Sequence, residues 1–400
     1  MEEKTYFGQL NEMLRARERA LPCLLLDLDR VDKNVALLRS QLRPDAHFRI
    51  VVKSLPSPEL IQYLMEKGHT DKLMVFHQPF LTDLAARLDH QADVLLGKPL
   101  PIKTADYFFK YLPPSSQGFH PFKQIQWLVD TSERVLQYIE LAKKLGQKLR
   151  LNLELDIGLR RGGFNSLESL RTGLEIIQQN LEWVELSGFM GYDPHVVNIP
   201  SMIMSQTKAL RLANSFYQEA KMMVRQAFPS IWKEDLCFNG AGSPTFPLHQ
   251  SADSPLNDLS AGSCLVMPAG FDIASLQGYL AASFIATPVL KKFKGTTIPG
   301  LERVKGVLNM VSKENMQSFF LYGGYWKAQY WYPKGLKQNE IFGPSTNQTM
   351  VNAPLTAKLD VDDFVFLRPK QSEFVFLHFG EILPIREGQF LAPWSLLNNR

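Results

Sequence analysis

The chain has 400 residues, of which 45% are apolar and 21% charged, an ordinary composition for a folded protein long enough to form two domains. Its 44 basic and 40 acidic side chains leave a net charge of +4, and the densest basic run is the short stretch Lys291-Lys292-Phe293-Lys294. This distribution of charge does not indicate a nucleic-acid partner.

The three cysteines, Cys23, Cys237 and Cys264, each lie among apolar residues and have neither CxxC nor Cys/His metal spacing. We therefore expect buried thiols in a reducing compartment. The amino-terminal residues are charged, unlike those of a signal peptide, and no apolar window is long enough to span a membrane. These features predict a cytoplasmic protein with no membrane partner.

From residue 21 onward, short apolar runs alternate with longer helical patterns, which is typical of a parallel α/β architecture. Before them, residues 6–19 have helical spacing, so we expect 1–20 to be a helical segment. The runs that we expect to form strands are 21–29, 48–53, 73–76, 93–96, 125–130, 149–155, 186–190 and 236–238. About eight strands separated by helices predict a (β/α)8 TIM-type barrel, which needs roughly 250 residues and would occupy 21–275.

The pattern changes after Asp272. Turns rich in Gly, Pro and Asn then separate further apolar runs, at 285–290, 300–311, 318–322, 364–368 and 373–379. This pattern is typical of antiparallel strands, and it predicts a C-terminal β-rich domain at 276–400.

Lys53 ends the apolar run Phe48–Val52 and precedes a Ser/Pro turn that leads into a helix. Barrel enzymes place catalytic groups at the carboxyl ends of their strands. A partly desolvated amine at such a position is more often neutral and nucleophilic, as Schiff-base chemistry with a carbonyl or with pyridoxal phosphate requires. The alternative is a strand-end lysine that extends to water, which Lys53 taken alone favours, and the rest of the chain reverses this preference.

Two further segments follow predicted strands at the same end of the barrel. In Glu154–Phe164 a strand ends in an acid, a turn glycine and an arginine pair, and an arginine there can bind a phenolate or a carboxylate. Gly191–His195 brings a phenol, a carboxylate and an imidazole to the rim, where His195 can orient a cofactor ring or relay a proton. Each segment also has a structural interpretation, as a solvated loop or a loop histidine.

Residues Asn239–Thr245 form a loop of small residues after a late strand. Glycines allow backbone N–H groups to approach a phosphate closely, and the hydroxyls of Ser243 and Thr245 can donate to it. Loops after the last strands of such barrels often bind phosphate. A short Gly-Ala-Gly is a weak signal by itself, and its position after a late strand is what favours a phosphate site.

Taken in order, these motifs resemble those of a known family. They are Lys53 followed by Ser-x-x-Ser-Pro-Glu-Leu, Asp156-x-Gly-x-x-Arg161-x-Gly163, Gly191-Tyr192-x-x-His195, Asn239-Gly-Ala-Gly-Ser and Ser260-Ala-Gly-Ser. The set is similar to that of the fold type III pyridoxal-phosphate enzymes, which have the alanine racemase fold. Within that fold it looks most like the D-threonine aldolase and D-serine dehydratase branch, in particular its amino acid deaminase/aldolase-like members.

The resemblance implies that Lys53 forms the internal aldimine with pyridoxal 5'-phosphate and later moves a proton at the substrate Cα. It assigns further catalytic roles to His195, beside the cofactor ring, and to Arg161, at the cofactor hydroxyl or the substrate carboxylate. The other cofactor contacts that it implies are Arg49, Tyr192, Asn239, Gly240, Ala241, Gly242, Ser243 and Thr245. It also implies a head-to-tail homodimer in which one subunit's β domain completes the other's site, with Tyr325 either at that junction or in the domain core.

One segment departs from the family pattern. The aldolases and dehydratases carry a His-x-Cys or His-x-Asp metal pair in the closing domain, which by position would fall on Gln371–Glu373. Gln371 is a poor substitute for imidazole, whereas Glu373 can still ligate a hard cation such as Mg²⁺ or Mn²⁺, act as a metal-free base or bind the substrate amino group. His378 fits a strand residue better than a ligand. We therefore assign no metal ligand, and a divalent metal stays open.

The chain is thus predicted to be a pyridoxal-phosphate-dependent lyase. We expect it to act on a small D-amino acid, above all one with a β-hydroxyl, by aldol cleavage or by elimination and deamination through a Lys53 Schiff base. One alternative is a racemase that uses Lys53 and a second acid/base. Another is a cofactor-binding protein without turnover, which the extra residues after Asp272 disfavour, and the last is a barrel without cofactor in which Lys53 is structural.

Overall fold

The computed structural model describes residues 2–115, 117–295 and 316–398. The chain divides into two compact units. What we call the barrel unit contains Asn34–Leu265, Ile273–Tyr279 and the residues from Leu397 on, and the β unit contains the residues up to Lys33, Val266–Asp272 and Leu280–Leu396.

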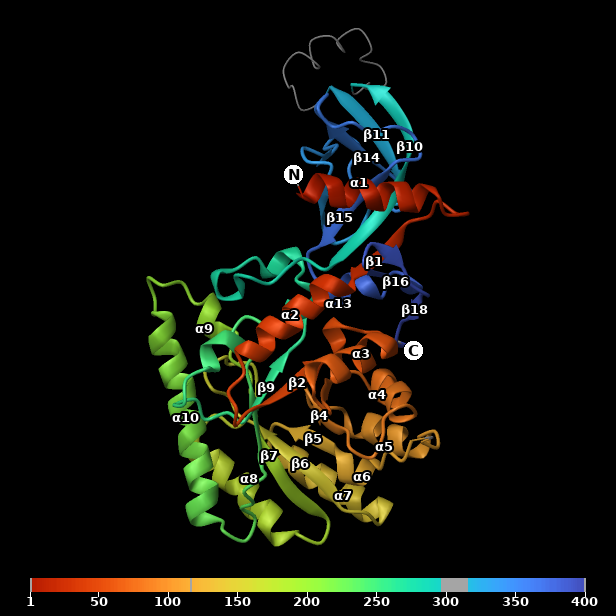
Figure 1. Cartoon of the computed structure of the whole chain (residues 1–400). Helices are drawn as coiled ribbons and strands as arrows, with labels where there is room; N and C mark the ends of the chain where they lie inside the picture. The colour runs from red at the N-terminus through yellow and green to blue at the C-terminus, as the bar shows by residue number, and fades with distance from the viewer. Residues whose placement is uncertain (1, 116, 296–315, 399–400) are drawn as a thin grey trace. The chain divides into compact units, whose positions relative to one another are not determined.

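Over the described residues, eight parallel strands close into the barrel that gives the first unit its name (Figure 1). They are β2 (His47–Val51), β3 (Lys72–Val75), β4 (Asp93–Leu96), β5 (Ile125–Val129), β6 (Leu149–Glu154), β7 (Val184–Gly191), β8 (Cys237–Gly240) and β9 (Asp258–Ala261). Each pairs with the next, and β9 pairs back with β2, with Asp258 opposite His47. The expected (β/α)8 barrel is therefore confirmed.

Helices connect these strands and surround the barrel in Figure 1. They are α3 (Pro58–Gly68), α4 (Gln78–Ala85), α5 (Ile102–Lys110), α6 (Pro121–Gln124), α7 (Ser132–Leu145), α8 (Leu167–Gln179), α9 (His195–Asn198) and α10 (Gln206–Ala227), with 3-10 turns η1 (Val52–Ser54), η2 (Phe246–His249) and η4 (Ala274–Leu276). The start of α3 follows from sequence, because Ser57 accepts the N–H of Leu60 and Pro58 occupies the first turn. The chain can therefore turn sharply just after Lys53. Helices α2 (Leu28–Ser40) and α11 (Ser263–Val266) contain residues of both units.

The β unit is built on a sheet that has ten strands within the described part of the chain. Its main path is β13-β14-β11-β10-β1-β16-β17, and β15 pairs with β10 and β12 while β18 pairs with β16. The elements are α1 (Glu2–Arg15), β1 (Cys23–Asp27), η3 (Ala269–Phe271), β10 (Ser283–Lys294), β11 (Gln317–Tyr322), β12 (Ala328–Tyr332), β13 (Lys337–Gln338), β14 (Gln348–Ala353), β15 (Phe364–Pro369), α13 (Ser372–Phe376), β16 (Glu381–Arg386), β17 (Gln389–Phe390) and β18 (Trp394–Ser395). The predicted β-rich domain is thus present.

Helix α1 supplies part of the core of the β unit. Its residues Phe7, Leu10 and Leu14 lie on one face and are buried. The ring of Phe7 packs at 4.9 Å from that of Phe366 on β15 and at 5.2 Å from that of Phe284 on β10. The helical segment expected at the amino terminus therefore belongs with the β sheet (Figure 1).

The expected first barrel strand forms elsewhere. Strand β1 pairs antiparallel with β10 and parallel with β16, so the run 21–29 belongs to the β unit. The eighth barrel strand is β9, which the pattern of apolar runs missed. In β9, Asp258 and Ser260 face polar partners inside the barrel, so the strand lacks an apolar run although all four of its residues are buried.

The structure differs from expectation in the last expected strand of the β unit. The run 373–379 was expected to be a strand, and the structure instead forms helix α13. Phe374 is exposed while Val375 and Phe376 are buried, a pattern that does not alternate, so the strand prediction for this run and for His378 was wrong. The expected strand 300–311 lies outside the described residues. No helix in the described part of the chain is long and apolar enough to cross a membrane.

Candidate active site

Arg49 lies inside the barrel, below the strand ends. It is fully buried, and its guanidinium donates to Asp258 at 2.8 and 2.7 Å and pairs with Asp93 at 2.8 Å. Burial opposes the charge of Arg49, but the two carboxylates raise the pKa of the guanidinium well above its ordinary value. Burial also opposes the charge of Asp93 and so raises its pKa. The charges of Arg49, Lys72 and Arg150 outweigh burial and lower the pKa of Asp93 to about 2.

Amide side chains extend this ionic centre across the barrel interior. Gln126 donates to Asp93 at 2.9 Å, Asn152 donates to Gln126 at 3.0 Å, and Asn239 donates to Asp258 at 2.6 Å. Arg49 and Asn239, both expected to contact a cofactor, are therefore bound to neighbouring side chains within the interior. Their cofactor contacts stay predictions, and the structure assigns them a part in filling the barrel.

Lys53 lies in turn η1, directly beyond the end of β2. Its side chain is half-buried, and its Nζ lies 4.6 Å from the centre of the Phe76 ring. The next residue, Ser54, is buried and accepts a hydrogen bond from Ser263 at 3.1 Å. The predicted nucleophile thus lies at the carboxyl end of its strand, in a turn tied to the loop after β9.

The loops after β8 and β9 are joined to each other as well. The hydroxyl of Ser243 accepts the N–H groups of Gly262 and Cys264, each at 3.1 Å. Gly262 passes so close to β2 that a Cβ on it would lie 2.8 Å from the carbonyl oxygen of Val51, so a larger residue does not fit. The structure therefore brings the Lys53 turn and the predicted phosphate loop together.

Tyr192 lies against the same loop. A Cβ added to Gly242 would lie 2.8 Å from the Tyr192 ring, so the ring packs directly on the backbone there. The hydroxyl of Thr245 accepts the N–H of Gly242 at 3.1 Å and donates to Asp193 at 2.6 Å. Thr245 is fully buried. Its hydroxyl therefore braces the loop from within.

Arg161 is exposed on the loop that follows β6. The carboxylate of Asp156 accepts the N–H groups of Gly158 and Arg160 at 3.1 and 2.9 Å and so shapes this loop. The guanidinium of Arg161 lies 5.2 Å from the centre of the Tyr192 ring. The structure thus places Arg161 beside Tyr192, with its charge accessible.

His195 begins the short helix α9. Its Nδ1 is buried and has no hydrogen-bond partner among the described residues. Burial lowers the pKa of the imidazole below its ordinary value, although the charges of Asp193 and Asp156 act in the opposite direction. Burial thus disfavours the charged imidazole, and the buried Nδ1 can form a hydrogen bond with a bound molecule.

Glu154 is a site residue that sequence reasoning noted only as the end of a strand. Burial, with the charges of Asp130 and Asp156, raises the pKa of its carboxyl to about 7, although the Arg161 charge acts to lower it. A carboxyl that titrates near neutral pH is suited to proton transfer. The sequence carried one signal for this position: Glu154 lies two residues after Asn152 on the same strand, so both side chains point into the barrel.

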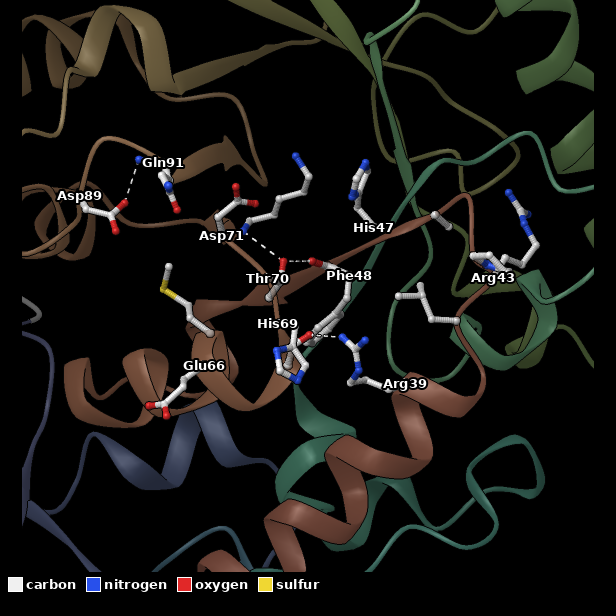
Figure 2. A pocket seen from close by; sticks show the side chains of 16 residues that line it. Arg39, Arg43, His47, Phe48, Glu66, His69, Thr70, Asp71, Asp89 and Gln91 are labelled. Carbon is white, nitrogen blue, oxygen red and sulfur yellow. Dashed lines mark hydrogen bonds between the residues drawn. The ribbon is translucent and has the colours of Figure 1, made fainter.

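A cavity of about 820 Å³ opens at the other end of the barrel, near the amino ends of β2 and β3. Figure 2 shows its lining, with Arg39, His69 and Thr70 on one side and Asp89 and Gln91 on the other. It contains none of the predicted site residues. The cavity therefore lies apart from the strand ends that carry Lys53.

Tyr325 lines a separate cavity of about 730 Å³ within the β unit, together with Trp326, Lys327 and Phe374. Tyr325 is 62% exposed, which excludes the core position that was its alternative. Beside this cavity, Lys327 donates to Gln371 at 2.6 Å, and the amide of Gln371 donates to Glu373 at 2.6 Å.

Comparison with known proteins identifies the family. Residues 26–267 match the model of the alanine racemase N-terminal domain, which is more than half of the chain. This chain belongs to the alanine racemase N-terminal domain family. Members of that family bind pyridoxal phosphate. No curated protein matched the sequence.

The solved structures of an aldolase, a dehydratase and a racemase are similar to the structure of this chain. The D-threonine aldolase of Filomicrobium marinum has a TM-score of 0.72 at 14% identity, over 96% of this chain and 98% of the aldolase. The D-threo-3-hydroxyaspartate dehydratase of Delftia sp. HT23 has 0.70 at 13%, over 96% and 98%. The alanine racemase of Clostridium difficile 630 has 0.72 at 15%, over 96% and 100%. At such identities the likeness shows the fold alone.

The barrel residues fit the cofactor of the alanine racemase family. The buried Nδ1 of His195 has no hydrogen-bond partner among the described residues and the His195 ring is free of Cβ crowding from Gly158, while Gly242 and Gly262 let the loops beyond β8 and β9 pack closely on Tyr192 and on β2. The side chains around Gln371 bond to one another, since its carbonyl oxygen accepts the ammonium of Lys327 and its amide donates to Glu373. Among the described residues, no group of three or more His, Cys, Asp or Glu side chains is placed to hold a metal.

Proposed function

We propose that this protein is a pyridoxal-phosphate-dependent lyase that acts on a small D-amino acid with a β-hydroxyl group. The reaction would be aldol cleavage, or elimination followed by deamination. The observation that carries the proposal is the link from the Lys53 turn, through Ser54 and Ser263, to the loop that Ser243 joins. These buried hydrogen bonds join the turn of the predicted nucleophile to the predicted phosphate loop, which supports the proposal.

In this proposal the loop Gly240–Thr245 holds the cofactor phosphate, and Tyr192 and His195 lie along the ring. When bound, the cofactor draws electrons from the substrate Cα, so that a bond to Cα can break. Lys53 holds the cofactor and moves the proton at Cα. Arg161, whose charge is accessible, binds the substrate carboxylate.

Glu154 is placed to exchange a second proton in this mechanism. The pKa of its carboxyl is raised to about 7, and the charge of Arg161 acts to lower that pKa. It would take the proton of the β-hydroxyl in aldol cleavage, or supply a proton to the leaving hydroxyl in elimination. No step of this mechanism needs a metal at Gln371.

Glu373 was expected to act as a metal-free base or to bind the substrate amino group. In the β unit its carboxylate accepts the amide of Gln371, which in turn accepts Lys327. We propose that Glu373 takes one of these two roles while Gln371 and Lys327 hold its carboxylate in position. Full activity in Glu373→Ala would reject the idea.

The alternative is a racemase, in which a second acid/base returns the proton to the opposite face of Cα. The alanine racemase of Clostridium difficile 630 is as similar in fold as the aldolase, and Glu154 would serve as the second group. Formation of the mirror-image amino acid, with no aldehyde or keto acid released, would identify it. For either activity we propose a homodimer, as the resemblance implies, and a cytoplasmic location, as the composition of the sequence indicates.

The proposal is tested by the visible absorbance of the purified protein and of Lys53→Ala, before and after borohydride reduction. We expect a cofactor band in the wild type that reduction fixes covalently on Lys53, and no such adduct in Lys53→Ala. Panels of D- and L-amino acids would then show which substrates perturb the band. Absence of a band after pyridoxal phosphate is added would reject the proposal.

A further inference from the structure

A second polar network lies in the barrel unit, behind the loop Gly240–Thr245. Asp193 follows β7 and is 1% exposed. Its Oδ1 accepts the hydroxyl of Thr245 at 2.6 Å, and its Oδ2 lies 2.8 Å from Nε2 of His249, which is 2% exposed. The Nδ1 of His249 lies 2.9 Å from the hydroxyl of Ser254. These four side chains form a continuous buried chain.

The residue types are those of a hydrolytic triad, but the arrangement is different. In a serine hydrolase the carboxylate holds Nδ1 and the serine faces Nε2. Here the carboxylate faces Nε2 and the serine faces Nδ1. Ser254 is only 9% exposed, and its oxygen also accepts the N–H of Leu256 at 3.4 Å. The network therefore has no accessible nucleophile, and its hydrogen bonds are those of a structural network.

The direction of the hydrogen bonds is set by Asp193. A carboxylate only accepts, so Thr245 must give its hydroxyl proton to Asp193 and can use its lone pairs for the N–H of Gly242. The carbonyl of Gly242 in turn accepts the N–H groups of Thr245 and Phe246 at 2.9 and 2.8 Å. The turn at Gly242 is therefore closed from both sides.

The same network reaches the cofactor-ring side of the site. Asp193 directly follows Tyr192, whose ring packs on Gly242, and it raises the pKa of His195 against the effect of burial. One buried carboxylate thus connects the segment after β7 to the loop after β8. Both segments carry residues expected to contact the cofactor.

We propose that Asp193, Thr245, His249 and Ser254 form a positioning relay that shapes the loop Gly240–Thr245 for the phosphate of the cofactor. This inference rests on the proposed function. It changes the part expected of Thr245, whose hydroxyl is bound to Asp193 and so shapes the loop instead of donating to the phosphate.

The test compares two probes, pyridoxal 5'-phosphate and pyridoxal, which lacks the phosphate. Their dissociation constants are measured by absorbance titration of the full-length apoprotein and its variants. In Thr245→Val we expect binding of the phosphorylated probe to weaken on the order of ten-fold, as loss of a buried hydrogen bond predicts, while pyridoxal binding changes less than about two-fold. Asp193→Asn removes the charge but still offers Thr245 an acceptor, so it should weaken the phosphorylated probe in the same direction by less. Thr245→Ser keeps the hydroxyl and should restore affinity.

A matched control is Gln124→Met. Gln124 is also buried and donates to the carbonyls of Asp89 and Ala92 at 2.8 and 2.6 Å, before β4 and β5 begin. This variant loses buried hydrogen bonds at the opposite end of the strands, so the ratio of the two affinities should not change. If Asp193→Asn does not fold, Ser254→Ala tests the outer end of the relay with a smaller effect in the same direction.

Three outcomes would count against the relay. Equal weakening of both probes would mean that the network maintains the fold without acting on the phosphate. Unchanged binding of the phosphorylated probe in Thr245→Val would reject the relay while leaving the proposed function in place. A wild type that binds neither probe would reject the proposed function and the relay with it.

Discussion

Two arginines of the barrel unit were both expected at the cofactor, and the structure gives them opposite environments. Arg49 is fully buried between Asp93 and Asp258. Arg161 is exposed and lies against the ring of Tyr192. A charge enclosed by two opposite charges is neutralised within the protein, whereas a charge at the rim against an aromatic ring remains available to a ligand. Arg49 lies within strand β2, whereas Arg161 lies in the loop after β6, and this difference in position decides their environments.

The largest expected effect comes from Arg49→Met. The substitution leaves the buried Asp258 without its ion-pair partner and removes the nearest of the charges that face Asp93, and loss of one partner from a buried ion pair costs about 3–5 kcal/mol. The free energy of unfolding, measured by urea denaturation, should fall by this amount. A loss below about 1 kcal/mol would contradict the structural role given to Arg49.

Arg161→Met is the counterpart at the rim. We expect kcat/KM to fall on the order of a hundred-fold, about 2.7 kcal/mol, because the substrate carboxylate loses its cation. The free energy of unfolding should change by less than about 0.5 kcal/mol, because the side chain is exposed. Arg161→Lys, which keeps the charge, should lose less activity. Equal effects on stability in the two methionine variants would remove the distinction between the arginines.

Acid should weaken the buried centre. The pKa of Asp93 is lowered from 3.8 to about 2, since the charges of Arg49, Lys72 and Arg150 outweigh burial. A lowered pKa stabilises the folded state above the unfolded value and loses this contribution as pH falls, so the change lies between about pH 4 and pH 2. It amounts to about 2 kcal/mol. Unfolding of the wild type and Asp93→Asn at several pH values should converge as the pH approaches 2, and parallel curves would contradict the assignment.

A pH dependence of the opposite sign is expected at Glu154, near the rim. Burial, Asp130 and Asp156 raise the pKa of its carboxyl from 4.5 to about 7. A raised pKa means that the ionised form disfavours folding, so stability falls as pH rises from about 4.5 to 7 and then levels off. Glu154→Gln should therefore be more stable than the wild type at pH 8, by about 3 kcal/mol, and similar to it at pH 4.

Thermal unfolding at pH 4 and pH 8 provides that measurement. If Glu154 also moves a proton, the limb of the pH–rate profile near pH 7 should disappear in Glu154→Gln. A stability difference that is equal at both pH values would show that the carboxyl of Glu154 has an ordinary pKa.

Much of the barrel followed from local pattern. The alternation of apolar runs with helical spacing predicted a closed barrel, and the Ser57-Pro58 cap explains why α3 begins just beyond Lys53. The strand count agreed through two compensating errors, because β1 joins the β unit and β9 has the polar residues Asp258 and Ser260 in its inward positions. Apolar periodicity misses a strand whose inner face binds an arginine.

The sequence by itself determined the order of the elements and which residues follow the barrel strands, because backbone propensity, caps and turn residues act over a few positions. It placed Lys53, Tyr192, His195 and the loop Gly240–Thr245 at strand ends before any contact was known. Only the tertiary structure decided their partners. Arg49 meets Asp258 across 209 positions of sequence, and Asp193 meets His249 across 56. Such pairings depend on barrel closure, which brings together side chains that no local pattern relates.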